Sequence, residues 1–368
     1  MAAPLWLWYS YLRTGRADLF RLAEAHARNT SETDVYHLGD MKGLGTRHNV
    51  VKWGDGAKEA RVSQAAHWRF FYYLTTDERT GDIMREAAES ADIAVARYDP
   101  MREAAPRTPD EPAVRMRVGP DWYALAGNWM TEWERTGDTR WRDRILAGVD
   151  SIMAMPYWLL TGKPNPNGVG AGEAVVGYDV ATKKLFPITD PVTKATVPVS
   201  YNLATIQGGA QVMFELVPLL GRKDFETAWL QICRIGAASP EILTRDKTTG
   251  AEGADASLTY AGQSGPRLAA YAYAKTKIPA FAQKAIAGML AQGAGIAAPH
   301  RVSGPDSLKP VEEDARISTN EAAQTGLSII EILELCKDLL PTEAAVRPAR
   351  GPRGARGAPA PAPAPGGN

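Results

Sequence analysis

The segment from Asp34 to Arg69 holds the densest set of side chains that could carry out chemistry. It contains three of the five histidines of the chain, together with arginines, acids and two tryptophans, among many glycines. Imidazole, guanidinium and carboxylate groups serve as general bases, anion clamps and acids, and loops that combine them are often sites. The candidate residues here are Tyr36, His37, His48, Trp53, Asp55, Glu59, Arg61, His67 and Arg69.

Two further polar, glycine-rich segments each precede a predicted helix. Residues 200–209 read SYNLATIQGG and residues 260–267 read YAGQSGPR. Free backbone N–H groups at a helix start can bind an anion, although the same residues could serve only as helix caps. The candidates from these segments are Tyr201, Asn202, Gln207 and Arg267.

Several common classes of protein are excluded by what the sequence lacks. It has no HExxH zinc motif, no acidic calcium loop and no GxSxG serine motif. We therefore predict no cofactor and no metal, with calcium near His37 or Asp55 as the less favoured alternative. Lys+Arg and Asp+Glu both number 42, and no run of about 18 apolar residues occurs, so we expect neither a nucleic acid nor a membrane as partner.

The elements that would position these residues are helical hairpins. An apolar helix, a turn and a second amphipathic helix recur, with turns expected at Gly15, Gly81, Gly137, Gly221 and Lys277. Asp82 and Asp138 are expected to cap the helices that follow their turns. A period near 56 residues with long connections favours a closed ring of hairpins over an open solenoid. The predicted fold is all-α, an (α/α)n toroid that starts within a hairpin and is incomplete at its N-terminus, since residues 5–12 already read as a buried helix.

The expected domain boundaries follow from composition. Residues 1–340 form the toroid, with an insertion of loop and short strands at about 163–200. Residues 341–368 form a Pro/Ala/Gly/Arg tail that is predicted to be disordered. Cys233 and Cys336 are expected to be buried thiols. Trp53, Trp122 and Trp158 fall at loop edges, where an exposed indole could stack on a sugar.

The segment from His48 to Arg69 resembles the helical domain of the YetA-like, exo-acting rhamnogalacturonan lyases, which form polysaccharide lyase family 26. The preceding DVYH and the segments MPYWLLTGKPNPNG and YNLATIQGGAQVMFEL share this likeness, which spans roughly residues 5–340. The resemblance implies a toroid preceded by β-rich domains that this chain lacks. It also implies β-elimination on the galacturonic acid–rhamnose backbone of pectin, a polysaccharide substrate.

The residue types fit this chemistry. Elimination needs a clamp for the uronate carboxylate, a base for the C5 proton and an acid for the leaving oxygen. Arginines serve as clamps, histidines as bases and tyrosines as acids, with Arg47 as a further clamp. We expect catalytic roles for His48, His67, Arg61 and Tyr201. We expect substrate-binding roles for Tyr36, His37, Trp53, Asp55, Glu59, Arg69, Asn202 and Arg267.

Two other functions stay open. A glycoside hydrolase on the same ring would need two carboxylates about 5–10 Å apart, with Asp55 or Glu59 opposite Asp179 or Asp255 as candidates. A truncated, non-catalytic glycan-binding module is the third possibility. Localisation stays open as well: no signal peptide is recognised at the start of the sequence, whereas enzymes that act on polysaccharides are normally exported.

Overall fold

A computed structural model gives the structure of the protein. It describes residues 3–47, 57–100, 114–156, 158–161, 173–188, 198–199, 207–236, 244–245, 252–253, 265–297, 301–302, 313–314 and 319–340. The predicted tail at 341–368 and much of the insertion at about 163–200 lie outside these residues.

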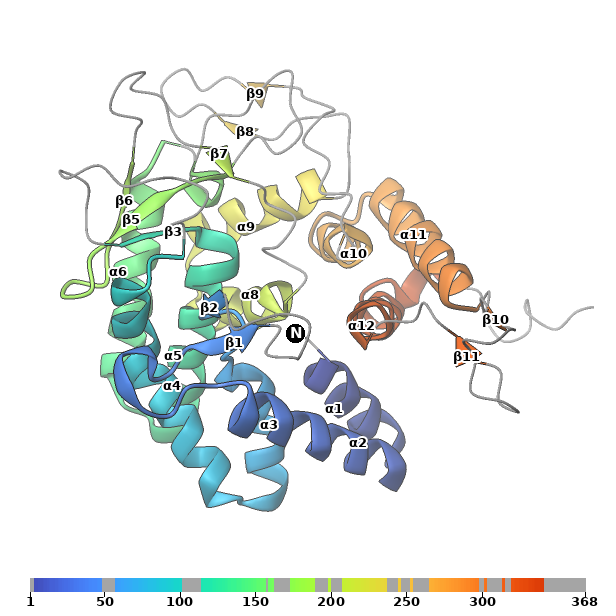
Figure 1. Ribbon diagram of the computed structural model, residues 1–368. Coiled ribbons are helices and arrows are strands. Elements are labelled where there is room, and N and C mark those ends of the chain that lie inside the picture. The colour runs from blue at the N-terminus through green and yellow to red at the C-terminus, as the bar shows by residue number, and fades with distance from the viewer. Residues whose placement is uncertain are drawn as a thin grey trace, which may run out of the picture.

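Antiparallel helical hairpins follow one another along the described chain (Figure 1). The hairpins pair α1 (Ala3–Thr14) with α2 (Ala17–Arg28), α3 (Ala65–Thr75) with α4 (Glu78–Arg97), α5 (Tyr123–Thr136) with α6 (Thr139–Ala154), α8 (Gly209–Leu220) with α9 (Lys223–Gly236), and α10 (Gly265–Thr276) with α11 (Pro279–Ala297). The helix α12 (Thr319–Leu335) and the short helix η5 (Lys337–Leu339) follow.

Each hairpin turns at a residue in the left-handed conformation: Gly15, Thr76, Gly137, Gly221 and Lys277. The predicted turns at Gly15, Gly137, Gly221 and Lys277 are confirmed, and so is the Asp138 cap, whose Oδ1 accepts from Arg140 N at 2.9 Å.

The prediction for the second hairpin is wrong. Gly81 lies inside α4 and packs against Tyr72, and Asp77 rather than Asp82 caps the helix, with its Oδ1 accepting from Thr80 N at 2.8 Å. The sequence ERTGD misleads because it repeats the ERTGD of the next hairpin, whose glycine does form a turn.

The first helix of each hairpin, together with α12, forms an inner ring. The backbone N–H of Ala65 in α3 donates to Asn128 Oδ1 in α5 at 2.7 Å, and Gly127 of α5 packs closely on Val212 of α8. Phe214 of α8 stacks on Tyr271 of α10, with ring centroids 4.9 Å apart.

Helix α12 closes this ring between α10 and α1. Arg267 of α10 donates to Gln324 O at 2.8 Å, and Gly326 of α12 packs directly on Trp6 of α1. On the other side of α1, Tyr9 packs edge-on against Phe70 of α3. Because the first and last described helices are neighbours, the inner ring is continuous.

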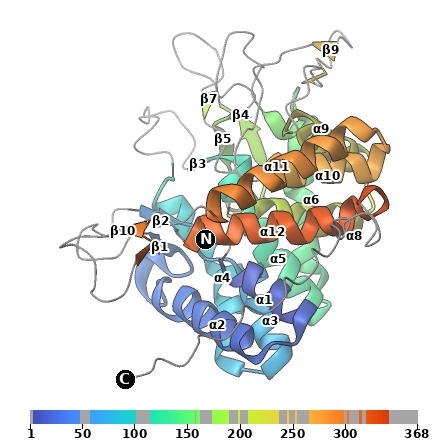
Figure 2. The same ribbon diagram turned by 90° about the vertical axis from the view of Figure 1, so that its right-hand side faces the viewer.

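The two ends of the ring differ. Short turns follow the inner helices α1, α3, α5, α8 and α10, whereas long connections precede α3, α5, α8, α10 and α12. We call the end with the long connections the mouth. In Figure 2, β1, β2 and the N-terminus of the chain lie together at one end of α12.

Short antiparallel strands lie in these connections. The pairs are β1 (Gly45–Arg47) with β2 (Ala57–Glu59), β4 (Glu173–Ala174) with β7 (Pro198–Val199), β8 (Thr244–Arg245) with β9 (Glu252–Gly253), and β10 (Arg301–Val302) with β11 (Glu313–Asp314). A three-stranded sheet has the order β3 (Arg115–Met116), β5 (Val176–Tyr178), β6 (Leu185–Pro187). The short helices are η1 (Asn29–Thr33), η2 (Gly39–Met41), η3 (Val118–Trp122) and η4 (Trp158–Leu160).

The core between the helical layers is rich in tryptophan. Trp122, expected at an exposed loop edge, is instead fully buried and packs on Gly148 of α6, so it cannot stack on a ligand there. Cys233 and Cys336 are buried free thiols, as predicted. No helix in the described part of the chain is both long and apolar enough to cross a membrane.

Candidate functional site

The segment that leads into α3 carries an arginine that is paired with a nearby acid. Arg61 lies between β2 and α3 and is 3% exposed. Its Nε donates to Glu59 Oε2 at 2.5 Å, and its Nη2 pairs with Glu59 Oε1. Burial lowers the pKa of Arg61, which the Glu59 carboxylate partly offsets. Its Nη1 has no hydrogen-bond partner among the described residues.

A buried glutamine joins α3 to the start of α8. Gln64 Nε2 donates to the carbonyl oxygens of Arg61 and Gln207, both at 2.6 Å. Asn128 of α5 supports the same point, since its Nδ2 donates to Ser63 O at 3.0 Å. The chain before α3 is thus anchored to two neighbouring inner helices.

His67 lies in the first turn of α3 and is 4% exposed. Its Nε2 faces Gly208, where an added Cβ would collide with the imidazole, and Gly208 has a φ of +86°. Burial lowers the pKa of His67 to about 3, so the ring is neutral near pH 7. In this conformation His67 supports the backbone at the start of α8 rather than facing solvent.

We define the mouth cluster as Arg61, Ser63, Gln64, His67 and Gln207. Each has a buried side-chain atom with no partner among the described residues: Arg61 Nη1, Ser63 Oγ, Gln64 Oε1, His67 Nε2 and Gln207 Oε1. Buried polar groups are nearly always hydrogen-bonded, so this concentration marks a place for ordered water or for the polar groups of a ligand. Sequence reasoning selected Arg61 and His67 and singled out Gln207 at the loop-to-helix junction, but it missed Ser63 and Gln64.

A second set of polar side chains connects α8, α10 and α12 inside the ring. We call this set the axial network and define it by Gln211, Arg267, Gln324 and Glu331. Arg267 is fully buried, and its Nε lies 3.3 Å from Glu331 Oε2. Gln211 Nε2 donates to Glu331 Oε1 at 2.8 Å, and Arg267 Nη2 donates to Gln324 Oε1 at 2.6 Å. Burial raises the pKa of Glu331 to about 7, although Arg267 opposes the shift. Arg267, a predicted substrate ligand, therefore has protein partners here.

Arg69, another predicted ligand, is held between two acids. Its Nη1 donates to Glu134 Oε2 at 2.9 Å, and its Nη2 donates to Glu215 Oε1 at 2.7 Å. These residues line a pocket that opens near the short turns, away from the mouth, with a volume of about 440 Å³.

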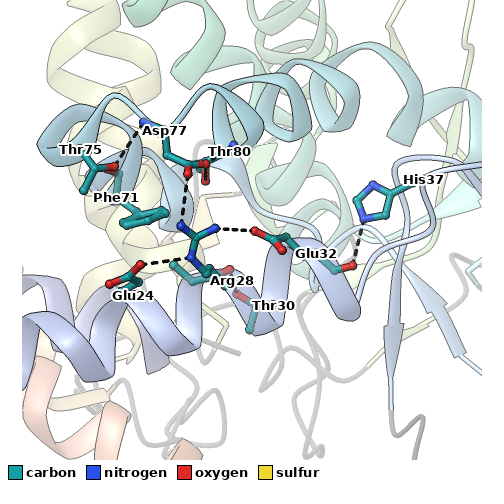
Figure 3. A network of polar contacts seen from close by, with 10 residues as sticks. Glu24, Arg28, Thr30, Glu32, His37, Phe71, Thr75, Asp77 and Thr80 are labelled. Carbon is teal, nitrogen blue, oxygen red and sulfur yellow. Dashed lines mark hydrogen bonds and ion pairs between the residues drawn. The ribbon is translucent and has the colours of Figure 1, made fainter.

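His37 and Tyr36 lie in the connection that follows α2. His37 Nδ1 is 2.9 Å from Glu86 Oε1 of the outer helix α4. Its Nε2 donates to Glu32 O at 3.2 Å (Figure 3). The backbone of Tyr36 closes a loop, because its N–H donates to Leu44 O and its carbonyl oxygen accepts from Gly43 N, both at 2.9 Å. The structure therefore places His37 against the outer layer, apart from the mouth cluster.

The remaining predicted site residues cannot be placed. His48, Trp53, Asp55, Tyr201 and Asn202 lie outside the described residues, as does Asp255.

The carboxylates proposed for a hydrolase have structural partners where they are described. Asp179 accepts from Ala181 N and from Thr182 Oγ1, both at 2.8 Å, in the turn between β5 and β6. Glu59 is bound by Arg61. Within the part of the chain that the structure covers, no group of three or more His, Cys, Asp or Glu side chains could hold a metal ion.

The closed inner ring and its outer helices define an α/α toroid. The sequence matches, over residues 1–341, the family model described as PcRGLX-like protein C-terminal alpha/alpha toroid domain, and the chain belongs to that family. It is 35% identical over 347 residues to the uncharacterized protein YetA of Bacillus subtilis (strain 168). That match covers 93% of this chain but 38% of YetA, so the chain spans well under half the length of this relative. The predicted α/α toroid of helical hairpins and the YetA-like resemblance are confirmed. The expectation that the ring starts within a hairpin is wrong, because residues 5–12 belong to α1, which pairs with α2 in a full hairpin.

Proposed function

We propose that this toroid binds a uronate-containing pectin chain at its mouth and takes part in β-eliminative cleavage of rhamnogalacturonan. Membership of the PcRGLX-like family supports a relation to rhamnogalacturonan lyases. The observation that carries the proposal is the mouth cluster, where buried polar atoms without protein partners gather at the starts of α3 and α8.

The electrostatics of the mouth suit an anionic sugar. The N-terminal end of a helix carries a partial positive charge, and both α3 and α8 begin at this end of the ring. The free Nη1 of Arg61 can donate to a carboxylate, while Gln64 and Gln207 offer amide oxygens to sugar hydroxyls. A uronate beside a neutral sugar would satisfy both kinds of group.

The proposed reaction needs three roles. Arg61 binds the uronate carboxylate and stabilises the charge that develops when the C5 proton leaves. His48 accepts that proton, the electron pair forms the C4–C5 double bond, and the C4–O bond breaks. Tyr201 donates a proton to the leaving oxygen. His67, enclosed and neutral, keeps Gly208 in place and so acts as a positioning residue.

The test is ultraviolet absorbance of the protein incubated with rhamnogalacturonan backbone, with and without a chelator. The unsaturated product absorbs because its double bond is conjugated to the carboxylate. We expect His48→Ala and Arg61→Gln each to lower the rate by about 100-fold or more, in the range found when a general base or a charge-stabilising donor is removed. His26→Ala, on the outer helix α2, is the matched control and should keep the rate of the unaltered chain.

Other outcomes decide between the alternatives. New reducing ends without a rise in absorbance would overturn elimination in favour of hydrolysis. Saturable binding of the oligosaccharide without turnover, lost in Arg61→Gln, would leave a glycan-binding module. The absence of both turnover and binding would refute the proposed function for this chain.

A further inference from the structure

The face opposite the mouth exposes large apolar and aromatic side chains. They lie in or just after the last turns of the inner helices α1, α3, α8, α10 and α12, whereas such residues are normally found singly on a surface. We call this surface the short-turn face and define it by Leu12, Tyr73, Leu74, Leu219, Ile278 and Leu339.

An acidic pocket opens on this face. It is lined by Arg69, Met130, Trp133, Glu134, Glu215 and Leu219. The side chains of Glu134 and Glu215 are 45% and 39% exposed, whereas Arg69 beneath them is 7% exposed. Tyr73 lies beside the pocket, because Glu134 is one of the charges that act on its hydroxyl.

The electrostatic balance of the pocket favours a cation. Two carboxylates face one guanidinium, which leaves an excess of one negative charge. The C-terminal ends of α3, α5 and α8 also point toward this side of the ring, and helix C-termini attract positive charge. Trp133 and Leu219 add apolar surface on which the stem of an arginine can pack.

The chain leaves the described structure on the same face. Asp338 of η5 accepts from Tyr273 OH at 2.7 Å and lies 3.3 Å from Lys277 Nζ, and Lys277 forms the turn between α10 and α11. The sequence that follows contains no acid after Glu343. Its four arginines, spaced among Pro, Ala and Gly, are Arg347, Arg350, Arg353 and Arg356.

We propose that residues 341–368 dock on the short-turn face of their own chain, with one arginine in the pocket between Glu134 and Glu215. Arginine pairs well with carboxylates, and Pro-rich segments bind aromatic and apolar surfaces at low entropic cost. A segment of this composition cannot bury a core of its own, but it can bind to a folded surface as an extended chain.

The tail is long enough for this. An extended Pro-rich chain rises about 3.1 Å per residue, so Arg347 to Arg356 lie within about 20–50 Å of Leu340. Inner helices about 8–10 Å apart give a six-membered ring a diameter of about 20 Å. The arginines can therefore reach the pocket from α12.

Limited trypsin digestion of the full chain tests the proposal, with mass spectrometry following the bonds after Arg350, Arg353 and Arg356. We expect cleavage in the chain to be about tenfold slower than in a synthetic peptide of residues 341–368, as when the effective concentration of the tethered tail is about ten times the dissociation constant of the contact. High salt should remove this protection, because it screens exposed charges. Glu134→Gln should speed cleavage about threefold, while Glu226→Gln, an acid outside the pocket, should not.

A second variant leaves the ring untouched. Arg350→Gln combined with Arg353→Gln should speed cleavage after Arg356, because two candidate anchors are lost. Equal cleavage rates in the chain and in the free peptide would overturn the proposal. Protection that disappears on dilution would also overturn it, because the face would then be occupied by a second copy of the chain.

Discussion

At the scale of single residues, the position of the His67 imidazole depends on a glycine 141 positions away in sequence. Any side chain at position 208 would collide with the ring, so only glycine leaves room for it. The positive φ of Gly208 adds a backbone reason for the same choice. One contact therefore fixes both the histidine and the start of α8.

Gly208→Ala should destabilise the protein by about 2–4 kcal/mol, because it adds both a clash and backbone strain. The check is the free energy of unfolding in urea. Gly221→Ala is the control: its φ is +63° but its Cβ would meet nothing within 4 Å, so it should cost only about 1 kcal/mol. His67→Ala should rescue part of the loss in Gly208→Ala, and additive effects of the two changes would contradict the proposed contact.

At the same scale, the residue types explain why only part of the mouth cluster could be predicted from the sequence. Histidine and arginine stand out by type, so Arg61 and His67 were predicted as site residues. Gln64 matters through its bond to Gln207 O, 143 residues away, which no local pattern reveals. Arg69 was predicted to bind substrate, but it forms an ion pair with Glu215, 146 residues away. No local sequence pattern could have predicted that pair either.

At the scale of elements, the hairpins could be predicted because their turns are local. Gly15, Gly137 and Gly221 each follow an apolar helix and adopt a positive φ, as glycine at a helix end does. Thr76 takes the same conformation without being glycine, which is why the second turn was misplaced at Gly81. The docking of hairpins through Arg267 and Glu331 could not be predicted, since their contact joins two helices across a long connection.

Arg267→Met should destabilise the junction of α10 and α12 by about 3–5 kcal/mol above pH 7, because it leaves the buried Glu331 carboxylate without its cation. The pKa of Glu331, about 7, is above its usual value of 4.5. Its protonation therefore favours the folded state, and this contribution is lost as the pH rises from about 4.5 through 7. The cost of Arg267→Met should accordingly shrink at about pH 5, where Glu331 is neutral.

Urea unfolding of the unaltered protein and of Arg267→Met, at about pH 5 and pH 8, measures how the cost of the substitution depends on pH. Lys275→Met is the control, since its ion pair with Glu226 is exposed and should contribute less than about 1 kcal/mol at either pH. A cost for Arg267→Met that does not depend on pH would show that Glu331 is not the group that responds.

At the scale of the whole molecule, α12 makes a ring out of what would otherwise be an open row of hairpins. Leu5 and Leu327 form a small cluster of their own, and Trp6 packs directly on Gly326. In an open array each unit contacts only its neighbours, so the terminal units open most easily. Closure gives both terminal helices two neighbours, and the protein should therefore unfold as one unit.

Gly326→Leu tests this property of the ring. The added side chain collides with the Trp6 indole and should push α12 off α1, leaving the other helix contacts in place. We expect amide hydrogen exchange to become faster in both α1 and α12 while α5 stays protected, and the unfolding transition to broaden as cooperativity falls. The control is Gly293→Leu on α11, where a Cβ would meet nothing within 4 Å. Faster exchange in α12 alone would mean that the two ends of the chain are not coupled, and that the toroid behaves as an open array whose last helix is merely attached.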